Sequence, residues 1–359
     1  MTTSPADDPY VVLIESIPVI NGRYHNPTRI GPIREGYFSL LFKARDATTG
    51  KEVALKFFDP RMMREQYRRD GFTREARLLG QFVGQPSILQ LLEGEQELAV
   101  DLRTADGITI PVPFYYFVTE LAPGSLKHFI YSAANNPHDA LVLFREACKG
   151  IQRLHAHSVC HRDFKPDNGL VFPGLILKVC DLGTARRLDE ATLLSRYDIP
   201  VGDRRYSALE LFCGVGNDPR WFFPADLFSL GAILFELFTR QILTQFIYDF
   251  RVLDDLSDFF AQRVPESQRR EKFQALLPHI QAKSPLPDLR SVDNIAPSCI
   301  VDRLNHLYRC LSDFDYRKRA RITFPWIFRQ VEICLIILEN EAKYRQWLEL
   351  RRRRRCGNV

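Results

Sequence analysis

The segment HRDFKPDN, residues 161–168, places a carboxylate, an ammonium and an amide close together in the chain. Asp163 is followed by Lys165 and then by Asn168, in what we predict to be a loop after a long helix. A carboxylate beside an attacking hydroxyl can orient it and accept its proton. An ammonium at the same place can neutralise charge on a transferring group. The segment therefore predicts chemistry on a negatively charged group.

A second set of polar residues has matching chemistry. Lys56 lies on the predicted strand VALK, and Glu75 follows on a predicted helix. An ion pair between strand and helix would aim the Lys56 ammonium at phosphate oxygens. Asp181, in KVCDLG, follows a short predicted strand, and the oxygens of Asp181 and Asn168 suit a hard cation such as Mg²⁺.

The elements that must position these residues fall into two regions. Residues 29–121 are mostly strand-like: a hairpin turns at 48–50, and strands 87–94 and 113–121 flank an inserted hairpin at 101–113. Within 61–83, apolar residues at helical spacing predict one helix. After residue 124 the predicted helices 138–159, 224–240 and 299–311 dominate. We therefore expect an α+β fold of two lobes joined near 120–124.

Composition narrows the class of protein. The 359 residues are 45% hydrophobic, enough for a sizeable core, and the net charge of +5 equals the contribution of Arg351–Arg355. The first residues lack the pattern of a secretory signal, and we expect no transmembrane segment, because the apolar stretches are far shorter than about 18 residues. Eight cysteines without a CxxC pair argue against a zinc site or a disulfide framework, and favour reduced thiols in the cytoplasm.

Six short motifs occur in the order that one family uses: VALK, HRDFKPDN, DLG, SALE, DLFSLG and DYRKR. With them, the chain resembles a eukaryotic-type (Hanks-type) Ser/Thr protein kinase over about residues 34–319. The resemblance implies a bilobal protein-kinase-like fold, with a small strand-rich N-lobe and a larger helical C-lobe. We assign an N-terminal extension to 1–28, the N-lobe to 29–121, the C-lobe to 122–340 and a basic tail to 341–359.

The resemblance also implies a role for each matched residue, with ATP and Mg²⁺ as cofactors and a protein Ser/Thr hydroxyl as acceptor. Asp163 would be the catalytic base, Lys165 would contact the γ-phosphate, and Asn168 and Asp181 would hold Mg²⁺. Lys56, held by Glu75, would bind the α- and β-phosphates. The remaining nucleotide contacts would come from Gly36 in the phosphate-covering loop, Leu41, Ala54 and Leu170 around the adenine, Thr119 as gatekeeper, and the backbones of Glu120 and Ala122.

The chain departs from the family pattern at two places. In the phosphate-covering loop only Gly36 remains, with Arg34 and Ser39 where the outer glycines usually stand. Asp203 stands where Ser/Thr kinases usually have a threonine; it could bond Lys165, but it would repel Asp163. Arg162 implies a basic pocket for an activation-loop phosphate, and the nearby acceptors and acidic residue are Thr192, Ser195, Tyr197 and Asp198.

The sequence leaves two alternatives to an active protein kinase, and it leaves the role of the C-terminal arginines open. The altered phosphate-covering loop and Asp203 suit a pseudokinase scaffold or ATP-binding regulatory module, whereas the complete set of polar motif residues opposes that alternative. A small-molecule phosphotransferase generally lacks the SALE-like segment and the DLFSLG helix. The run Arg351–Arg355 is either a solvated tail or a site for an anionic partner. The sequence does not indicate an oligomeric state.

Overall fold

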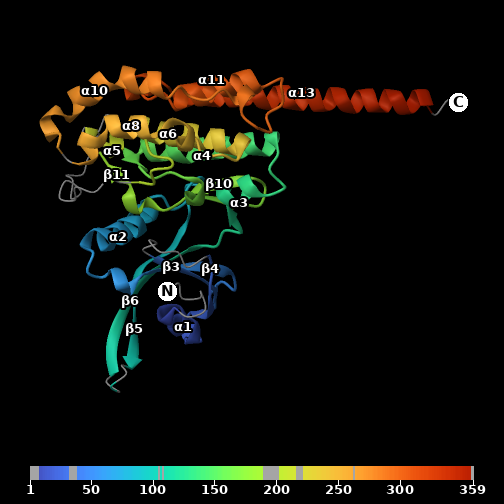
Figure 1. The fold of residues 1–359 in the computed structure, drawn as a ribbon. Coiled ribbons are helices and arrows are strands. Elements are labelled where there is room, and N and C mark those ends of the chain that lie inside the picture. Colours follow the sequence, from blue (N-terminus) through green and yellow to red (C-terminus); the bar gives the residue numbers. More distant parts are fainter. Residues whose placement is uncertain are drawn as a thin grey trace. The chain divides into compact units, whose positions relative to one another are not determined.

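The structure is a computed structural model that describes residues 8–31, 39–103, 106, 109–188, 202–215, 221–261 and 263–356. The chain forms two compact units (Figure 1). Unit 1 comprises Met1–Pro123 and Cys180–Thr184, and unit 2 comprises Gly124–Val179 and Ala185–Val359. Unit 1 is rich in strands and unit 2 in helices, which confirms the predicted α+β class. The division at Pro123 falls inside the predicted linker, but Cys180–Thr184 returns to unit 1.

Unit 1 is built on a six-stranded antiparallel sheet with the order β1-β2-β3-β4-β6-β5. Its strands are β1 (Val19–Ile20), β2 (Tyr24–Arg29), β3 (Ser39–Asp46), β4 (Glu52–Phe58), β5 (Leu91–Arg103) and β6 (Thr109–Glu120). Its helices are α1 (Pro9–Ser16), the short 3-10 helix η2 (Pro60–Met62), α2 (Gln66–Gln81) and the 3-10 helix η4 (Leu182–Thr184).

The two faces of this sheet have different partners, because side chains alternate along each strand. Val53, Leu55 and Phe57 of β4 point into an apolar core that also contains Val11 and Ile14 of α1. Helix α2 packs on the opposite face, where the Phe72 ring lies 5.5 Å from that of Phe58 and 4.9 Å from that of Phe117. The face covered by α2 is the one that carries Lys56.

Two parts of unit 1 differ from the sequence expectation. The proposed boundary at residues 28 and 29 falls inside β2, which pairs with β3, and α1 supplies core residues. Residues 8–29 are therefore part of the sheet's unit and not an appended extension. The inserted hairpin is the outer half of two long strands, since β5 and β6 pair continuously from Gln96–Tyr116 to Arg103–Thr109. Alternating apolar residues on both sides of the turn explain this extension.

Unit 2 contains two small sheets, β10-β9-β7 and β11-β8, surrounded by helices. The strands are β7 (Gly124–Ser125), β8 (Val159–Cys160), β9 (Gly169–Phe172), β10 (Ile176–Val179) and β11 (Arg186–Arg187). The first helices are α3 (Leu126–Tyr131), α4 (Pro137–Ala156), η3 (Pro166–Asn168), α5 (Leu209–Phe212), α6 (Phe222–Thr239) and α7 (Thr244–Ile247). The later helices are α8 (Phe250–Asp255), α9 (Ser257–Phe260), α10 (Glu266–Lys283), η8 (Leu289–Ser291), α11 (Val301–Leu311), α12 (Tyr316–Arg319) and α13 (Phe324–Cys356).

Helix α6 is the central element of unit 2, and α4 and α11 pack against it. It is predominantly apolar and is buried on all sides. Within the described residues it is also the one helix long and apolar enough to cross a membrane by composition, but 94% of it is buried inside the protein. Burial of this kind identifies α6 as a core helix.

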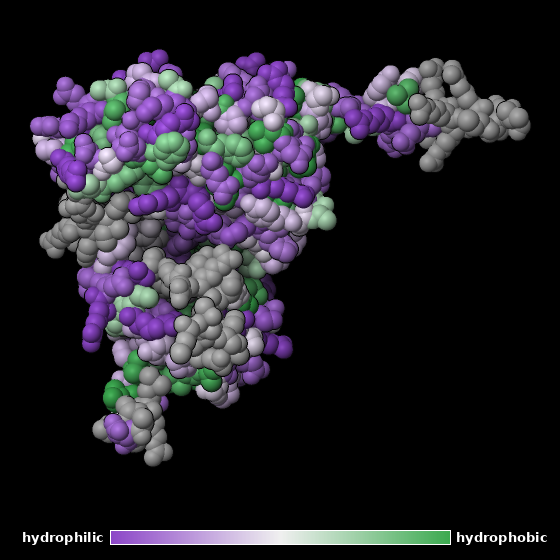
Figure 2. Space-filling model, viewed as in Figure 1, coloured by the Kyte–Doolittle hydropathy of each residue, from purple (hydrophilic) through white to green (hydrophobic). Residues whose placement is uncertain are grey.

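Helix α13 is longer than the sequence suggested. It runs without a break for 33 residues from Phe324 to Cys356, so no boundary separates a tail at residue 341. Its first part is anchored by Ile327, Val331 and Leu335, which are buried. Its outer part stands clear of the rest of unit 2 (Figures 1 and 2).

Candidate active site

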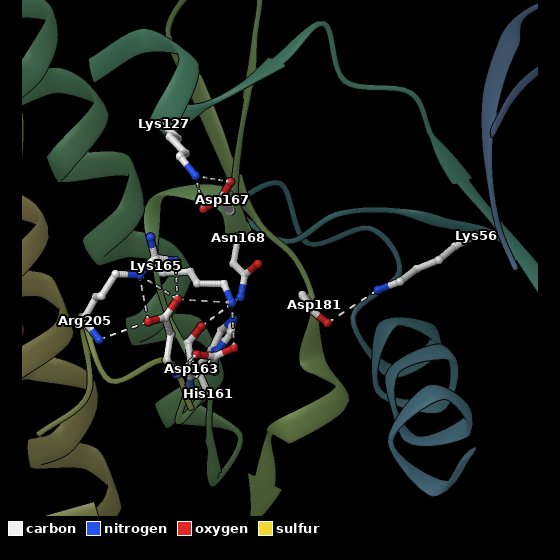
Figure 3. A network of polar contacts seen from close by, with 10 residues as sticks. Lys56, Lys127, His161, Asp163, Lys165, Asp167, Asn168, Asp181 and Arg205 are labelled. Carbon is white, nitrogen blue, oxygen red and sulfur yellow. Dashed lines mark hydrogen bonds and ion pairs between the residues drawn. The ribbon is translucent and has the colours of Figure 1, made fainter. Parts of the chain in front are cut away.

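The ammonium of Lys56 is held by two carboxylates in unit 1. Both oxygens of Glu75 on α2 accept hydrogen bonds from Lys56 Nζ, at 2.8 and 2.7 Å. Asp181 Oδ1 lies 3.4 Å from the same nitrogen (Figure 3). Burial lowers the pKa of Lys56, but the charges of Asp181 and Glu75 outweigh it and raise that pKa above its ordinary value. The ammonium therefore stays charged, and the predicted Lys56–Glu75 ion pair is confirmed.

One face of the unit 1 sheet carries the residues predicted to surround the nucleotide. Lys56 pairs with Leu41 of β3, and Ala54 pairs with Thr119 of β6. Paired residues share a face, and positions two apart on one strand do too. These four residues therefore share one face, with apolar side chains beside a fixed ammonium. This combination suits a ligand that has a ring at one end and an anion at the other.

Glu120 and Ala122 lie where β6 ends. The Glu120 N–H donates to the carbonyl of Gln90 at 3.1 Å, and the Glu120 carboxylate accepts the Gln90 N–H at 2.8 Å. Ala122 follows the strand and is partly exposed. Among the described residues, the backbone N–H of Ala122 has no hydrogen-bond acceptor, so it can donate to a ligand.

Asp181 adopts a backbone conformation that few residues tolerate. Its φ is +60°, in the left-handed region, where Asp is more easily accommodated than most residues. The Asp181 side chain is 41% exposed, whereas the side chain of its neighbour Lys56 is 19% exposed. Gly183, two residues on, approaches α2 so closely that an added Cβ would lie 3.3 Å from the Gly71 carbonyl oxygen. The exposed carboxylate is suited to a hard cation.

The loop that carries Asp163 is fixed in unit 2 by a buried carboxylate on α6. Asp226 accepts the backbone N–H groups of His161 and Arg162, both at 2.8 Å, and lies 2.8 Å from His155 Nε2. Arg162 has a φ of +69°, which is strained for an arginine. Burial raises the pKa of Asp226, but its bond to His155 and the neighbouring positive charge outweigh burial and lower it. The ionised carboxylate therefore holds the loop in its strained form.

Asp163, Lys165 and Asn168 converge in this loop. Lys165 Nζ donates to Asp163 Oδ2 at 3.2 Å, and Asn168 Nδ2 donates to the carbonyl of Asp163 at 2.8 Å (Figure 3). The Asn168 amide nitrogen thereby faces the loop backbone, and the amide oxygen of Asn168 points away from that backbone. The sequence prediction that a carboxylate, an ammonium and an amide lie together is confirmed for these three residues.

The carboxylate of Asp203, which was expected to repel Asp163, is bound by Arg205, with Nη2 at 2.6 Å and Nε at 3.0 Å. The backbone N–H of Asp203 donates to Asp163 Oδ1 at 2.6 Å. Burial raises the pKa of Asp203, but the bonds to Arg205 and the charge of Lys165 outweigh burial and lower it. Sequence reasoning missed Arg205, although an arginine two residues after an aspartate was a usable signal.

The other predicted site residues are placed as follows. Leu170 lies on β9 in unit 2, where it pairs with Lys178 and Ser125. Gly36 and Arg34 lie outside the described residues, as do Thr192, Ser195, Tyr197 and Asp198. The last residues of the SALE and DYRKR motifs, Glu210 and Arg319, form an ion pair that is fully buried in unit 2.

The donor chemistry fits the ligands that the resemblance implies. In the described part of the chain, no cluster of three or more His, Cys, Asp or Glu side chains could hold a metal. A magnesium ion needs few protein ligands, because phosphate oxygens and water complete its octahedron. Asp181 and Asn168 supply oxygen donors of the right kind, and Lys56 supplies a phosphate-binding ammonium.

Comparison with known proteins decides the family. The family described as the protein kinase domain matches residues 24–320. The chain belongs to the protein kinase family. It is 30% identical over 298 residues to "Serine/threonine kinase NLK" of Caenorhabditis elegans, covering 81% of this chain and 44% of that protein. It is 30% identical over 246 residues to "Serine/threonine-protein kinase NLK2" of Xenopus laevis, covering 68% of this chain and 51% of that protein.

A third relative has a different name. "Cyclin-dependent kinase B2-1" of Arabidopsis thaliana is 30% identical over 225 residues, covering 60% of this chain and 66% of that protein. The match to the NLK proteins thus spans about half of their length or less. The relatives place the chain with the serine/threonine protein kinases, a family that uses ATP and a divalent metal.

Proposed function

We propose that this chain transfers the γ-phosphate of ATP to a serine or threonine hydroxyl of a protein. The observation that carries the proposal is the Lys56 ammonium, fixed by both oxygens of buried Glu75 and adjacent to Asp181. A buried ion pair of this kind is expensive to desolvate and is weak evidence for stability. Phosphate binding by Lys56 would explain why the chain has this ion pair.

The residues of unit 1 would bind and orient ATP. Leu41 and Ala54 would contact the adenine together with Leu170 of unit 2, and Thr119 would border it. The Glu120 carbonyl and the Ala122 N–H would bond its edge. Lys56 would neutralise the α- and β-phosphates, and Asp181, with Asn168 of unit 2, would hold Mg²⁺. Bound Mg²⁺ supplies neutralisation of the triphosphate charge. Gly36, outside the described residues, would cover the phosphates.

The residues of unit 2 would act on the acceptor. Asp163, held by Lys165 and the Asp203 N–H, would accept a hydrogen bond from the Ser or Thr hydroxyl and then its proton. Lys165 would neutralise charge that develops on the transferred phosphoryl group. The reaction requires both sets of residues to act on the same ATP molecule.

The test is transfer of labelled phosphate from ATP with Mg²⁺ to a generic protein substrate, followed by phosphoamino-acid analysis. We expect phosphoserine or phosphothreonine, with activity lost by at least about 100-fold in Asp163→Asn and in Lys56→Met. Asp249→Asn is the matched control, because that carboxylate caps α8, a helix that carries none of the site residues.

Two outcomes would contradict the proposal. Nucleotide binding without transfer would indicate a pseudokinase scaffold. Transfer to small alcohols but to no protein would indicate a small-molecule phosphotransferase. Replacing Mg²⁺ by Ca²⁺ tests the metal: the proposal expects loss of transfer, because Mg²⁺ holds its ligands in a tighter octahedron.

We also propose that the outer part of α13 binds an anionic phospholipid surface. Tyr344 and Trp347 are 59% and 46% exposed, and their rings stack 5.9 Å apart. Arg351–Arg355 follow on the same helix. Trp and Tyr favour the membrane–water interface, and basic residues there gain about 1 kcal/mol each from anionic lipids.

Vesicle sedimentation tests this proposal, with phosphatidylcholine vesicles compared with vesicles that also contain phosphatidylserine. We expect binding to the anionic vesicles alone, weakened by salt and lost when Arg351–Arg355 are replaced by glutamine. Equal binding to both vesicle types, or binding to an RNA oligonucleotide but to neither vesicle, would refute it.

A cytoplasmic location is the accompanying proposal, and the seven of the eight cysteines whose side chains the structure describes are free thiols. Fractionation of cells that express the tagged chain would test this, and recovery from an oxidising compartment would contradict it.

A further inference from the structure

Two carboxylates, one of which belongs to the proposed catalytic base Asp163, flank the ammonium of Lys165. Lys165 Nζ lies 3.2 Å from Asp163 Oδ2 and 3.9 Å from Asp203 Oδ2. The side chains of all three residues are mostly buried, with 17% or less exposed. Two carboxylates share one ammonium in this partly desolvated site, and like charges so close together are unfavourable without further positive charge beside them.

Arg205 supplies the balancing charge. Its Nε and Nη2 atoms contact both Asp203 oxygens, with Nη2 2.6 Å from Oδ2 and Nε 3.0 Å from Oδ1. Figure 3 shows Arg205 beside Lys165 and Asp163. This is the forked geometry in which guanidinium groups bind carboxylates most strongly. The Arg205 backbone is fixed too, since its N–H donates to Asp203 Oδ1 at 3.0 Å and its carbonyl accepts the Thr244 hydroxyl at 3.0 Å.

The same local turn occurs elsewhere in the described chain. An aspartate accepts the backbone N–H and the guanidinium of an arginine two residues later at Asp59–Arg61, Asp249–Arg251, Asp288–Arg290 and Asp315–Arg317. In those places the pair caps a short helix. The turn at Asp203 differs because its backbone N–H and its carboxylate both face catalytic groups.

We propose that Arg205 is a positioning residue for the phosphotransfer reaction. By occupying both oxygens of Asp203, Arg205 keeps this carboxylate from drawing Lys165 away from Asp163. The Asp203–Arg205 pair then presents to the loop a neutral unit whose N–H orients Asp163. This is how the chain accommodates an acidic residue where its family usually has a threonine. The inference rests on the proposed kinase activity.

The test compares kcat and the KM for ATP in matched variants. We expect Arg205→Ala to lower kcat by about 10- to 100-fold, because small displacements of catalytic groups have effects of this size. The KM for ATP should change by less than about 2-fold, because Lys56 and the adenine-facing residues are untouched. Arg251→Ala removes the same turn contact at α8 and should keep the kcat of the unaltered chain.

Rescue separates positioning from simple loss of folding. Asp203→Asn removes the surplus charge and retains a side chain that forms the same turn. We therefore expect Asp203→Asn to restore at least about 10-fold of the kcat lost in Arg205→Ala, when the two changes are combined. Arg205→Lys, which keeps the charge but not the fork, should fall between Arg205→Ala and the unaltered chain.

Each contrary result has a distinct meaning. If the unaltered chain transfers no phosphate, the proposed function itself is refuted. If the unaltered chain is active but Arg205→Ala behaves like Arg251→Ala, only this inference is refuted. If Arg205→Ala is impaired and Asp203→Asn does not restore it, charge balance at Asp203 is not the reason, and the inference is also refuted.

Discussion

The buried ion pair between Glu210 and Arg319 provides a quantitative test of what holds unit 2 together. Both residues are 0% exposed, and they contact each other directly. Arg319 also donates through Nε to the carbonyl of Pro224 at 2.8 Å and contacts the carbonyl of Asp313. Its guanidinium therefore joins α5, the start of α6 and the turn before α12. We predict that Arg319→Ala strongly destabilises the protein.

The magnitude follows from what the substitution leaves behind. Removing one partner of a buried pair typically costs about 3–5 kcal/mol, because the other charge stays buried and unpaired. For a unit of about 150–250 residues, each kcal/mol lowers Tm by about 2–4 °C. The expected fall in Tm is thus about 6–20 °C. Arg317→Ala is the matched control on the same short helix: its side chain is 48% exposed and its pair with Asp315 is a surface bridge, worth at most about 1 kcal/mol.

The pH dependence sharpens this test. Burial raises the pKa of Glu210, and the charge of Arg319 opposes that rise without cancelling it. Removing Arg319 removes the opposition, so the pKa in the variant rises further. A carboxyl whose pKa is raised on folding destabilises the fold as pH rises above its unfolded value of about 4.3. The deficit of Arg319→Ala should therefore be largest at neutral pH and shrink as pH falls towards that value.

Thermal unfolding followed by circular dichroism, from pH 4.5 to 8, measures these effects. Adding Glu210→Gln to Arg319→Ala should recover part of the lost Tm, since the unpaired charge is gone. The reasoning is refuted if Arg319→Ala and Arg317→Ala lower Tm equally, or if the deficit of Arg319→Ala is independent of pH.

Three further predictions concern packing, acid stability and nucleotide binding. Gly231→Ala should destabilise the protein by about 1–3 kcal/mol in urea unfolding, because its Cβ would collide with Ser312 Oγ. Gly80→Ala in helix α2 meets only ordinary contacts and should stabilise the protein by up to about 1 kcal/mol. Asp226→Asn should destabilise at neutral pH by about 1.5–3 kcal/mol, and its deficit should shrink as pH falls below about 4, because the pKa of Asp226 is lowered in the folded state and that stabilisation is lost on protonation; a deficit unchanged by acid would contradict this. Lys56→Met should weaken binding of a fluorescent ATP analogue by about 10-fold or more, and unchanged binding would exclude its phosphate contact.

The sequence predicted well whatever depends on local pattern. The helices around α4, α6 and α11 follow from apolar spacing, and their observed limits lie within about three residues of those expected. The Lys56–Glu75 pair was predicted from residue type and from the strand and helix that carry the two residues. Motif order alone identified the family, because each motif has a fixed chemical task.

What the sequence did not predict depends on contacts across the fold. Residues 1–28 were set apart as an extension, yet tertiary packing of Val11 and Ile14 draws α1 into the core. The charge of Asp203 was judged by itself, and the role of Arg205 became visible only when both side chains were placed around Asp163. The full length of α13 was not predicted, because its charged second half lacks the apolar periodicity that indicates a helix.

The continuity of α13 has an electrostatic consequence. Glu341 still touches Cys299, with 2.7 Å between Oε2 and Sγ, and Arg351 follows ten residues later on the same helix. At about 1.5 Å per residue, the first of the five guanidinium-bearing residues stands about 15 Å beyond that contact. Physiological salt screens charges beyond about 8 Å. An anionic partner bound at Arg351–Arg355 would therefore affect unit 2 mechanically, through the continuous helix α13, and its electric field would contribute almost nothing.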